Sequence, residues 1–143
     1  MREIIFRGKS KNSGRWVYGD LVSNKYHNRQ GTHIYEKNDS VSCPSGYQFV
    51  RVNTNTVGQY TGINDRFGLK IFEGDILCQT IKNEFTNGQE SKIYYFVKFN
   101  NGMFATFYYD FLDEVEEGRL CEALIEVDKL EIVGNIYDNP QLL

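Results

Sequence analysis

The sequence lacks any long apolar run, and the ~20 consecutive apolar residues that a membrane-spanning helix needs occur nowhere in it. Its first residues, MREIIFRGK, alternate charged with apolar side chains and do not have the pattern of a secretory signal peptide. These two absences predict a soluble protein of the cytoplasm that has no membrane partner.

Cysteine and histidine are also scarce. The odd, scattered set of cysteines indicates reduced thiols and not a disulfide framework. No cysteine pair has the C-x₂-C spacing of a structural zinc site, and the glycines form neither a Walker loop nor a dinucleotide fingerprint. No catalytic residue, metal site or cofactor is therefore predicted. The residues concerned are Cys43, Cys78, Cys121, His27 and His33.

Aromatic residues, in contrast, are abundant. They make up 15% of the 143 residues, with ten Tyr and ten Phe against only two Pro. This composition favours pleated, half-buried β-sheets over helices. The length is that of one domain with a sizeable core. We predict a mainly β, antiparallel single domain over residues 1–143.

The clearest local signal is Asn101-Gly102, which lies between two runs rich in β-branched and aromatic residues. Both residues accept the positive φ of a type I′ turn, so this dipeptide predicts a tight β-hairpin over 93–109. A two-residue loop sets the register. The predicted pairs are Asn100 with Met103, Val97 with Thr106, and Tyr95 with Tyr108.

This predicted hairpin is apolar on both faces. A hairpin with one face in water would alternate apolar and polar residues, so each face needs cover. We predict that one face is a self-association surface, which makes the protein a homo-oligomer. That surface consists of Tyr94, Phe96, Phe107 and Tyr109.

Less marked patterns predict the other elements. Residues 110–118 favour a short helix, with Asp110 as N-cap and Gly118 as the C-terminal stop. Residues 119–127 are ambiguous between a second short helix and a strand. The polar segment 23–47 predicts either a short strand near His33–Tyr35 or a surface segment. Further strands are expected at 4–6, 15–22, 48–52, 69–72, 76–81 and 129–137, the first two forming a hairpin.

Charge is unevenly distributed along the chain. Residues 1–70 carry eleven Lys/Arg against five Asp/Glu, and residues 71–143 carry five against fourteen. The asymmetry fits two charged halves of one domain, copies that attract each other, or a nucleic-acid surface. Basic side chains and Trp16 crowd the first 29 residues, so nucleic-acid binding by this hairpin is an alternative function, although the pI of 5.4 opposes it. Its residues would be Arg7, Lys9, Lys11, Arg15 and Trp16.

Two segments share an aromatic, Gly-Asp, aliphatic order: Tyr18–Leu21 and Phe72–Ile76. The expected role is structural, because Gly permits a tight bend and Asp accepts hydrogen bonds from turn amides. The competing hypothesis is a metal-dependent hydrolase, in which Asp20 and Asp75 converge with the acidic run at 110–128.

Four segments in order resemble the YopX family. They are IIFRGK at 4–9, GRWVYGDLV at 14–22, TVGQYTGINDRFGLKIFEGDIL at 56–77 and EIVGNIYDNPQLL at 131–143. The resemblance implies a small phage or prophage protein with an SH3-like, barrel-type sheet, and it supplies no catalytic residue. We therefore expect a non-enzymatic accessory module in the cytoplasm of a bacterial host, which binds a phage or host protein and self-associates.

Overall fold

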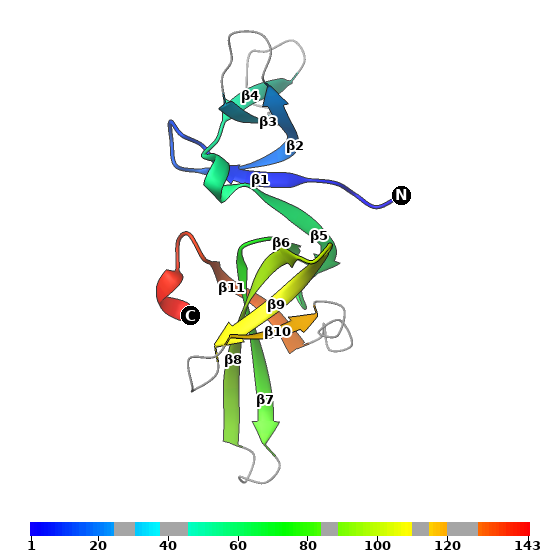
Figure 1. The fold of residues 1–143 in the computed structure, drawn as a ribbon, viewed down its shortest axis with the longest axis vertical. Helices are drawn as coiled ribbons and strands as arrows, with labels where there is room; N and C mark the ends of the chain where they lie inside the picture. Colours follow the sequence, from blue (N-terminus) through cyan, green and yellow to red (C-terminus); the bar gives the residue numbers. More distant parts are fainter. Residues whose placement is uncertain (25–30, 38–45, 84–88, 110–114, 120–128) are drawn as a thin grey trace. The chain divides into compact units, whose positions relative to one another are not determined.

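The protein folds into two compact units, Met1–Tyr60 and Thr61–Leu143. The structure is a computed structural model that describes residues 1–24, 31–37, 46–83, 89–109, 115–119 and 129–143 (Figure 1). The chain is mainly β and antiparallel, as predicted. Among the described residues, no helix is long and apolar enough to cross a membrane.

The N-terminal unit contains four antiparallel strands and the beginning of a fifth, in the order β4-β3-β2-β1-β5. Its core consists of Val17, Ile34 and Val52, packed against Leu21, Val50 and Val57. The strands are β1 (Phe6–Lys9), β2 (Trp16–Asn24), β3 (Gly31–Lys37), β4 (Tyr47–Arg51) and β5 (Gly58–Asn64), with a 3₁₀ turn η1 (Thr54–Thr56) before β5.

Strand β2 bends at Gly19. Its residues up to Gly19 pair with β1, and its residues from Asp20 onward pair with β3. Gly19 has φ +154°, and a Cβ at this position would lie 2.1 Å from the carbonyl oxygen of Tyr35. Only glycine permits this close approach of two backbones.

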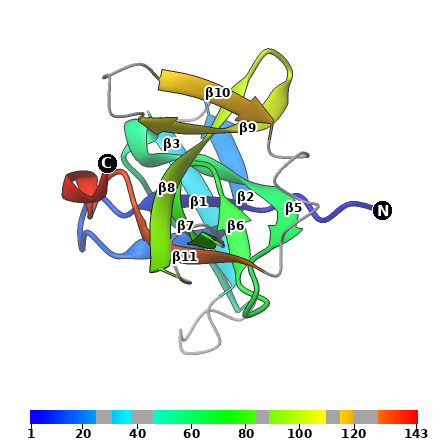
Figure 2. The ribbon, with the colours of Figure 1, turned by 90° about the horizontal axis from the view of Figure 1, so that it is seen from below.

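The C-terminal unit contains a five-stranded antiparallel sheet in the order β10-β9-β8-β7-β11 (Figure 2). Strands β8, β9 and β10 are consecutive along the chain and are also neighbours in the sheet. The short strand β6 lies next to β5. The core consists of Ile71, Leu77, Val97 and Leu130. The elements are β6 (Lys70–Phe72), β7 (Asp75–Asn83), β8 (Gln89–Asn100), β9 (Met103–Tyr109), β10 (Val115–Arg119), β11 (Leu130–Asn135) and the 3₁₀ turn η4 (Pro140–Leu142).

The hairpin predicted around Asn101-Gly102 is confirmed. Asn101 and Gly102 have φ of 47° and 83°, as a type I′ turn requires. Asn100 pairs with Met103 and Val97 pairs with Thr106. The rings of Tyr95 and Tyr108, the third predicted pair, lie 5.6 Å apart.

The helix predicted over 110–118 is wrong at its C-terminal half, because Val115–Arg119 form strand β10 antiparallel to β9. A two-turn helix is marginal on its own, whereas pairing with β9 satisfies the backbone groups of an otherwise open sheet edge. Arg119, where a second helix was the alternative, also lies in this strand. The remaining residues of both predicted helices, 110–114 and 120–127, lie outside the described residues.

Of the two alternatives for residues 23–47, the strand is confirmed, and it is longer than expected. Strand β3 spans Gly31–Lys37 and pairs with both β2 and β4. Residues 25–30 and 38–45 lie outside the described residues. The N-terminal hairpin is also confirmed, but residues 7–9, which we expected in its turn, belong to β1.

Replacing Gly19 with Ala is expected to lower the free energy of unfolding by about 2–4 kcal/mol, because the new Cβ collides with a backbone oxygen. The matched control is Gly14→Ala. Gly14 also has positive φ, at +70°, but no described heavy atom lies within 4 Å of a Cβ there, so a loss of about 1 kcal/mol is expected. Urea denaturation measures both. Equal losses would contradict the role of Gly19.

Candidate functional site: an aromatic face on the N-terminal unit

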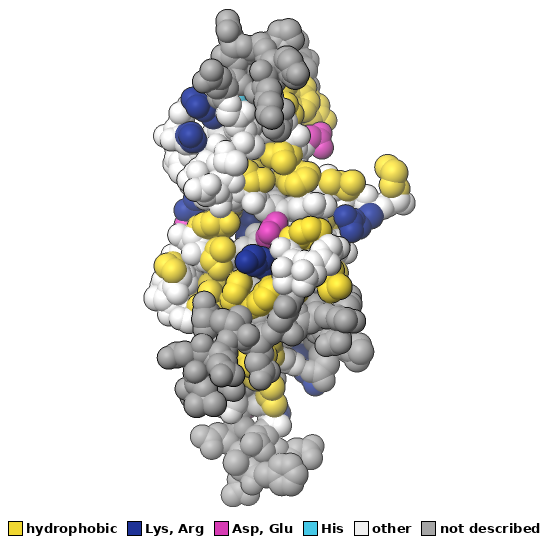
Figure 3. Space-filling view, in the orientation of Figure 1, with side chains coloured by type: hydrophobic (Ala, Val, Ile, Leu, Met, Phe, Trp, Pro, Cys, Tyr) yellow, Lys and Arg dark blue, Asp and Glu magenta, His cyan; other side chains and the backbone are white. Residues whose placement is uncertain are grey.

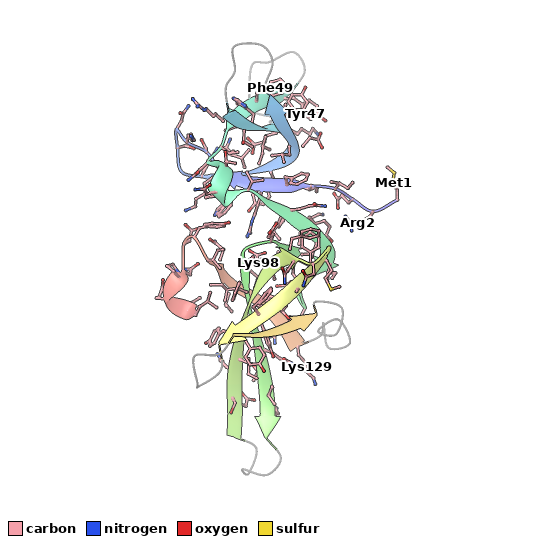
Figure 4. The ribbon with its side chains drawn as sticks, in the orientation of Figure 1. Met1, Arg2, Tyr47, Phe49, Lys98 and Lys129 are labelled. Atoms are coloured by element: carbon pink, nitrogen blue, oxygen red, sulfur yellow. The ribbon has the colours of Figure 1, made fainter. Side chains whose placement is uncertain are left out.

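The β3–β4 ladder carries rings and cations on one face. Its register pairs His33 with Arg51, Tyr35 with Phe49, and Lys37 with Tyr47. Because side chains alternate along a strand, these six residues share the face opposite the core residues Ile34 and Val50. His33 is buried. We call the surface formed by the other five residues the aromatic face: Tyr35, Tyr47, Phe49, Lys37 and Arg51. Figure 4 labels its two most exposed rings, Tyr47 and Phe49.

The three rings form one cluster. The centroid of Tyr35 lies 4.9 Å from that of Tyr47, with the planes 16° apart, and 4.7 Å from that of Phe49. Phe49 is 50% exposed and Tyr47 is 38% exposed. The cluster therefore stabilises its own geometry while presenting large apolar surface to solvent.

Charged side chains border the rings. Lys37 and Arg51 are exposed. A Cβ at Gly31 would lie 3.1 Å from Nε of Arg51, so the Arg51 side chain lies across β3 at that glycine. Asp20, which is also exposed, pairs with Tyr35 from the other side of β3. The face thus combines apolar rings with two cations and one carboxylate.

The nucleic-acid residues predicted from the sequence lie on the β1–β2 hairpin, and three of them are in contact. The guanidinium carbon of Arg7 lies 4.6 Å from the ring centroid of Trp16, and Nζ of Lys9 lies 5.6 Å from it. Arg7 is only 6% exposed. These cation–π contacts occupy the face of the indole within the fold, where a base would otherwise stack.

The other two predicted residues are both exposed, but Arg15 is paired. Its Nη1 and Nη2 donate to the two carboxylate oxygens of Glu36 at 2.9 and 2.6 Å, and Nε2 of Gln48 donates to Oε2 at 3.1 Å. The hydrogen bond from Arg15 is the main cause that lowers the pKa of Glu36, and the same bond raises the pKa of Arg15. Of the two exposed cations in the predicted set, Lys11 and Arg15, Arg15 is therefore held by an ion pair within the fold.

The predicted self-association surface is largely covered within the chain. Tyr94, Phe96 and Phe107 are half-buried, and the rings of Phe96 and Phe107 stack at 5.3 Å. Ile76 and Cys78, which pair with Phe96 and Tyr94, are buried. The side chain of Tyr109 lies outside the described part of the structure.

The two aspartates of the metal hypothesis occupy different units. Asp75 is buried, and its Oδ2 accepts a hydrogen bond from the backbone N–H of Phe72 at 2.7 Å, which confirms the predicted turn role. Asp20 is exposed on β2. Within the described ranges, no three His, Cys, Asp or Glu side chains gather as a metal site would require.

Comparisons with known proteins place this fold. The family model described as YopX protein matches residues 5–143, which is nearly the whole chain. The chain belongs to the YopX family. Among solved structures, this YopX protein is similar to the crystal structure of protein EF1440 from Enterococcus faecalis, with a TM-score of 0.53 and 20% identity over 100% of this chain and 99% of that one. That likeness concerns the fold alone. No curated protein matches the sequence.

Sequence reasoning missed the rings of the aromatic face in this YopX protein. Tyr-Gln-Phe-Val-Arg at 47–51 contains the signal, since its large side chains alternate with the period of a strand. We expected a strand at 48–52. The polar residues around β3 left it open whether a strand forms there, so the pairing of β3 with β4 that aligns Tyr35 with Phe49 could not be predicted. Alternation within two short segments shows which side chains share a face only when their pairing is known.

The Arg15–Glu36 pair predicts a pH dependence. Because the pKa of Glu36 is lowered in the folded state, its contribution to stability is present above the ordinary glutamate pKa and is lost as the pH falls through the folded-state value. Arg15 is 47% exposed, so the contribution is expected to be at most about 1 kcal/mol. Urea denaturation between neutral and acidic pH should show a smaller loss of stability for Glu36→Gln than for wild type. A double-mutant cycle with Arg15→Gln that gives no coupling energy at neutral pH would contradict it.

Proposed function

We propose that this YopX protein is a non-enzymatic module of a phage or prophage, which binds an unpaired strand of nucleic acid on the aromatic face in the cytoplasm of a bacterial host. The observation that carries the proposal is the row of exposed rings, Tyr47 and Phe49, with a cation at each end, Lys37 and Arg51, on one face of the β3–β4 ladder. Such a face offers rings on which the bases of a nucleic-acid strand can stack and cations for its phosphates.

The rings supply a stacking surface for bases. An exposed aromatic ring contributes about 1–3 kcal/mol per stacked base, and it does so with little sequence preference. Phe49 and Tyr47 are the exposed ends of the ring cluster, so a base can extend the stack there. Bases within a duplex already stack on one another, which favours an unpaired strand as the ligand.

The charge of the N-terminal unit favours a polyanion. Residues 1–60 carry nine Lys/Arg against four Asp/Glu, a balance of +5, while residues 61–143 carry seven against fifteen, a balance of −8. The acidic pI of the whole chain therefore conceals a basic unit. Lys and Arg lie on the surface of that unit together with hydrophobic side chains (Figure 3). Cations at this surface would release counterions from the phosphates.

The same proposal includes an SH3-like, barrel-type curvature for the N-terminal unit. Strand β2 changes partner at Gly19, and a glycine bend at which a strand changes partner is one way to curl a sheet. Curvature of this kind would present the aromatic face on a convex surface.

Binding to a protein, including a second copy of the chain, is the second candidate function. The observation that favours it is the opposite charge of the two units, +5 and −8, on one chain. Opposite charges speed the encounter of copies and orient them.

Fluorescence anisotropy of a labelled oligothymidylate at low salt tests nucleic-acid binding. Phe49→Ala and Tyr47→Ala are each expected to weaken binding about 5- to 100-fold, since each removes one stacking ring. Lys37→Gln and Arg51→Gln should each lower the slope of log K against log salt by about one. The matched control is Phe99→Ala, which removes an equally exposed ring from the C-terminal unit and should leave binding unchanged.

Two results would contradict the proposal. One is the absence of binding to oligothymidylate and to oligouridylate. The other is equal affinity of wild type and Phe49→Ala. If Lys11→Gln weakens binding while Phe49→Ala does not, the strand lies on the β1–β2 hairpin instead.

A further inference from the structure

The turn between β5 and β6 is rigidly built around a buried carboxylate. Asp65 is 4% exposed, and its Oδ1 accepts hydrogen bonds from the backbone N–H groups of Phe67 and Leu69, both at 2.9 Å. Its Oδ2 accepts from the N–H of Ile132 at 3.2 Å. The N–H of Gly68, whose φ is +81°, donates to the carbonyl oxygen of Asp65 at 2.9 Å. Four hydrogen bonds therefore hold the backbone of the turn in this conformation.

Two large apolar side chains project from this turn. Phe67 is 65% exposed and Leu69 is 56% exposed. Asp65 and Gly68 fix the backbone, so the fold itself does not require apolar side chains at positions 67 and 69. Water-exposed Phe and Leu on a rigid turn lose little conformational freedom when a partner covers them.

Arg66 completes the exposed surface. Its guanidinium carbon lies 4.6 Å from the ring centroid of Phe67, and its Nε lies 3.5 Å from Oε2 of Glu131. Arginine and aromatic residues are enriched among the residues that dominate binding energy at protein interfaces. We call Arg66, Phe67 and Leu69 the docking turn.

We propose that the docking turn binds the aromatic face of a second copy of this chain. The face exposes Tyr47 and Phe49, which gives apolar surface for Phe67 and Leu69 to cover. The unit balances, −8 for the unit of the docking turn and +5 for the unit of the face, favour the encounter of copies at long range, whereas at the contact itself Arg66 would meet two cations of the face, Lys37 and Arg51, and one carboxylate. Asp20, exposed beside Tyr35, supplies a carboxylate for the guanidinium of Arg66.

Such a contact joins two different surfaces, so it is heterologous and orders the copies head to tail. This inference rests on the proposed function in one respect, because nucleic acid and the second copy would occupy the same face. The two ligands then exclude each other. A strand of nucleic acid would release copies from one another, and self-association would weaken nucleic-acid binding.

Sedimentation velocity of the full chain over a range of protein concentrations tests the docking. Wild type is expected to associate as concentration rises, and added salt should weaken the association. The double variant Phe67→Ser/Leu69→Ser should raise the dissociation constant at least tenfold. The control is Phe99→Ser, which changes an exposed Phe of the same unit and should associate like wild type. Circular dichroism checks that each variant folds.

A strictly monomeric wild type, or equal association of wild type and the double variant, would overturn the docking. The proposed function fails separately. If oligothymidylate is not bound but both the double variant and Phe49→Ala lose association, the docking stands and nucleic-acid binding falls. If both proposals hold, oligothymidylate dissociates wild-type oligomers, and the double variant binds it at least as tightly as wild type does.

Discussion

The antiparallel pairing of β3 with β4 is the interaction on which the candidate site depends. The same register that buries Ile34 and Val50 in the core turns Tyr35 and Phe49 outward. A slip by one residue would exchange the two faces of both strands, so the free energy of core packing holds the rings in place. The same register therefore determines both the packing of this sheet and the exposure of its rings, since the aromatic face exists only while the opposite face is packed.

Unequal charge between the two units gives the chain two chemical characters. Averaged over 143 residues, the net charge of −3 suggests an ordinary acidic protein. Divided after Tyr60, the same charges give a basic unit with exposed rings and an acidic unit with an exposed apolar turn. Any partner selected by charge would distinguish the two units, and long-range fields decide encounter before close contacts form.

What the sequence predicted well was local. The hairpin at 93–109 and its register follow from Asn101-Gly102, because two adjacent residues that accept positive φ nearly determine the turn. The features that the sequence predicted poorly depend on pairing between strands that the local sequence does not determine. Capping signals favoured a helix where Val115–Arg119 instead complete the edge of β9. The ring cluster could not be predicted. Tyr35 and Phe49 meet only because β3 pairs with β4, and the polar residues around β3 give no signal of that pairing in the sequence.

In the turn at 65–69, the residues that fix the backbone differ from the residues that form its exposed surface. Two positions, the buried carboxylate of Asp65 and the left-handed Gly68, carry its geometry, while the side chains between and after them point away from the core. Substitutions at residues 67 and 69 are therefore expected to change the exposed surface of the turn at little cost to folding. The same property makes this turn a natural place to graft a foreign binding motif.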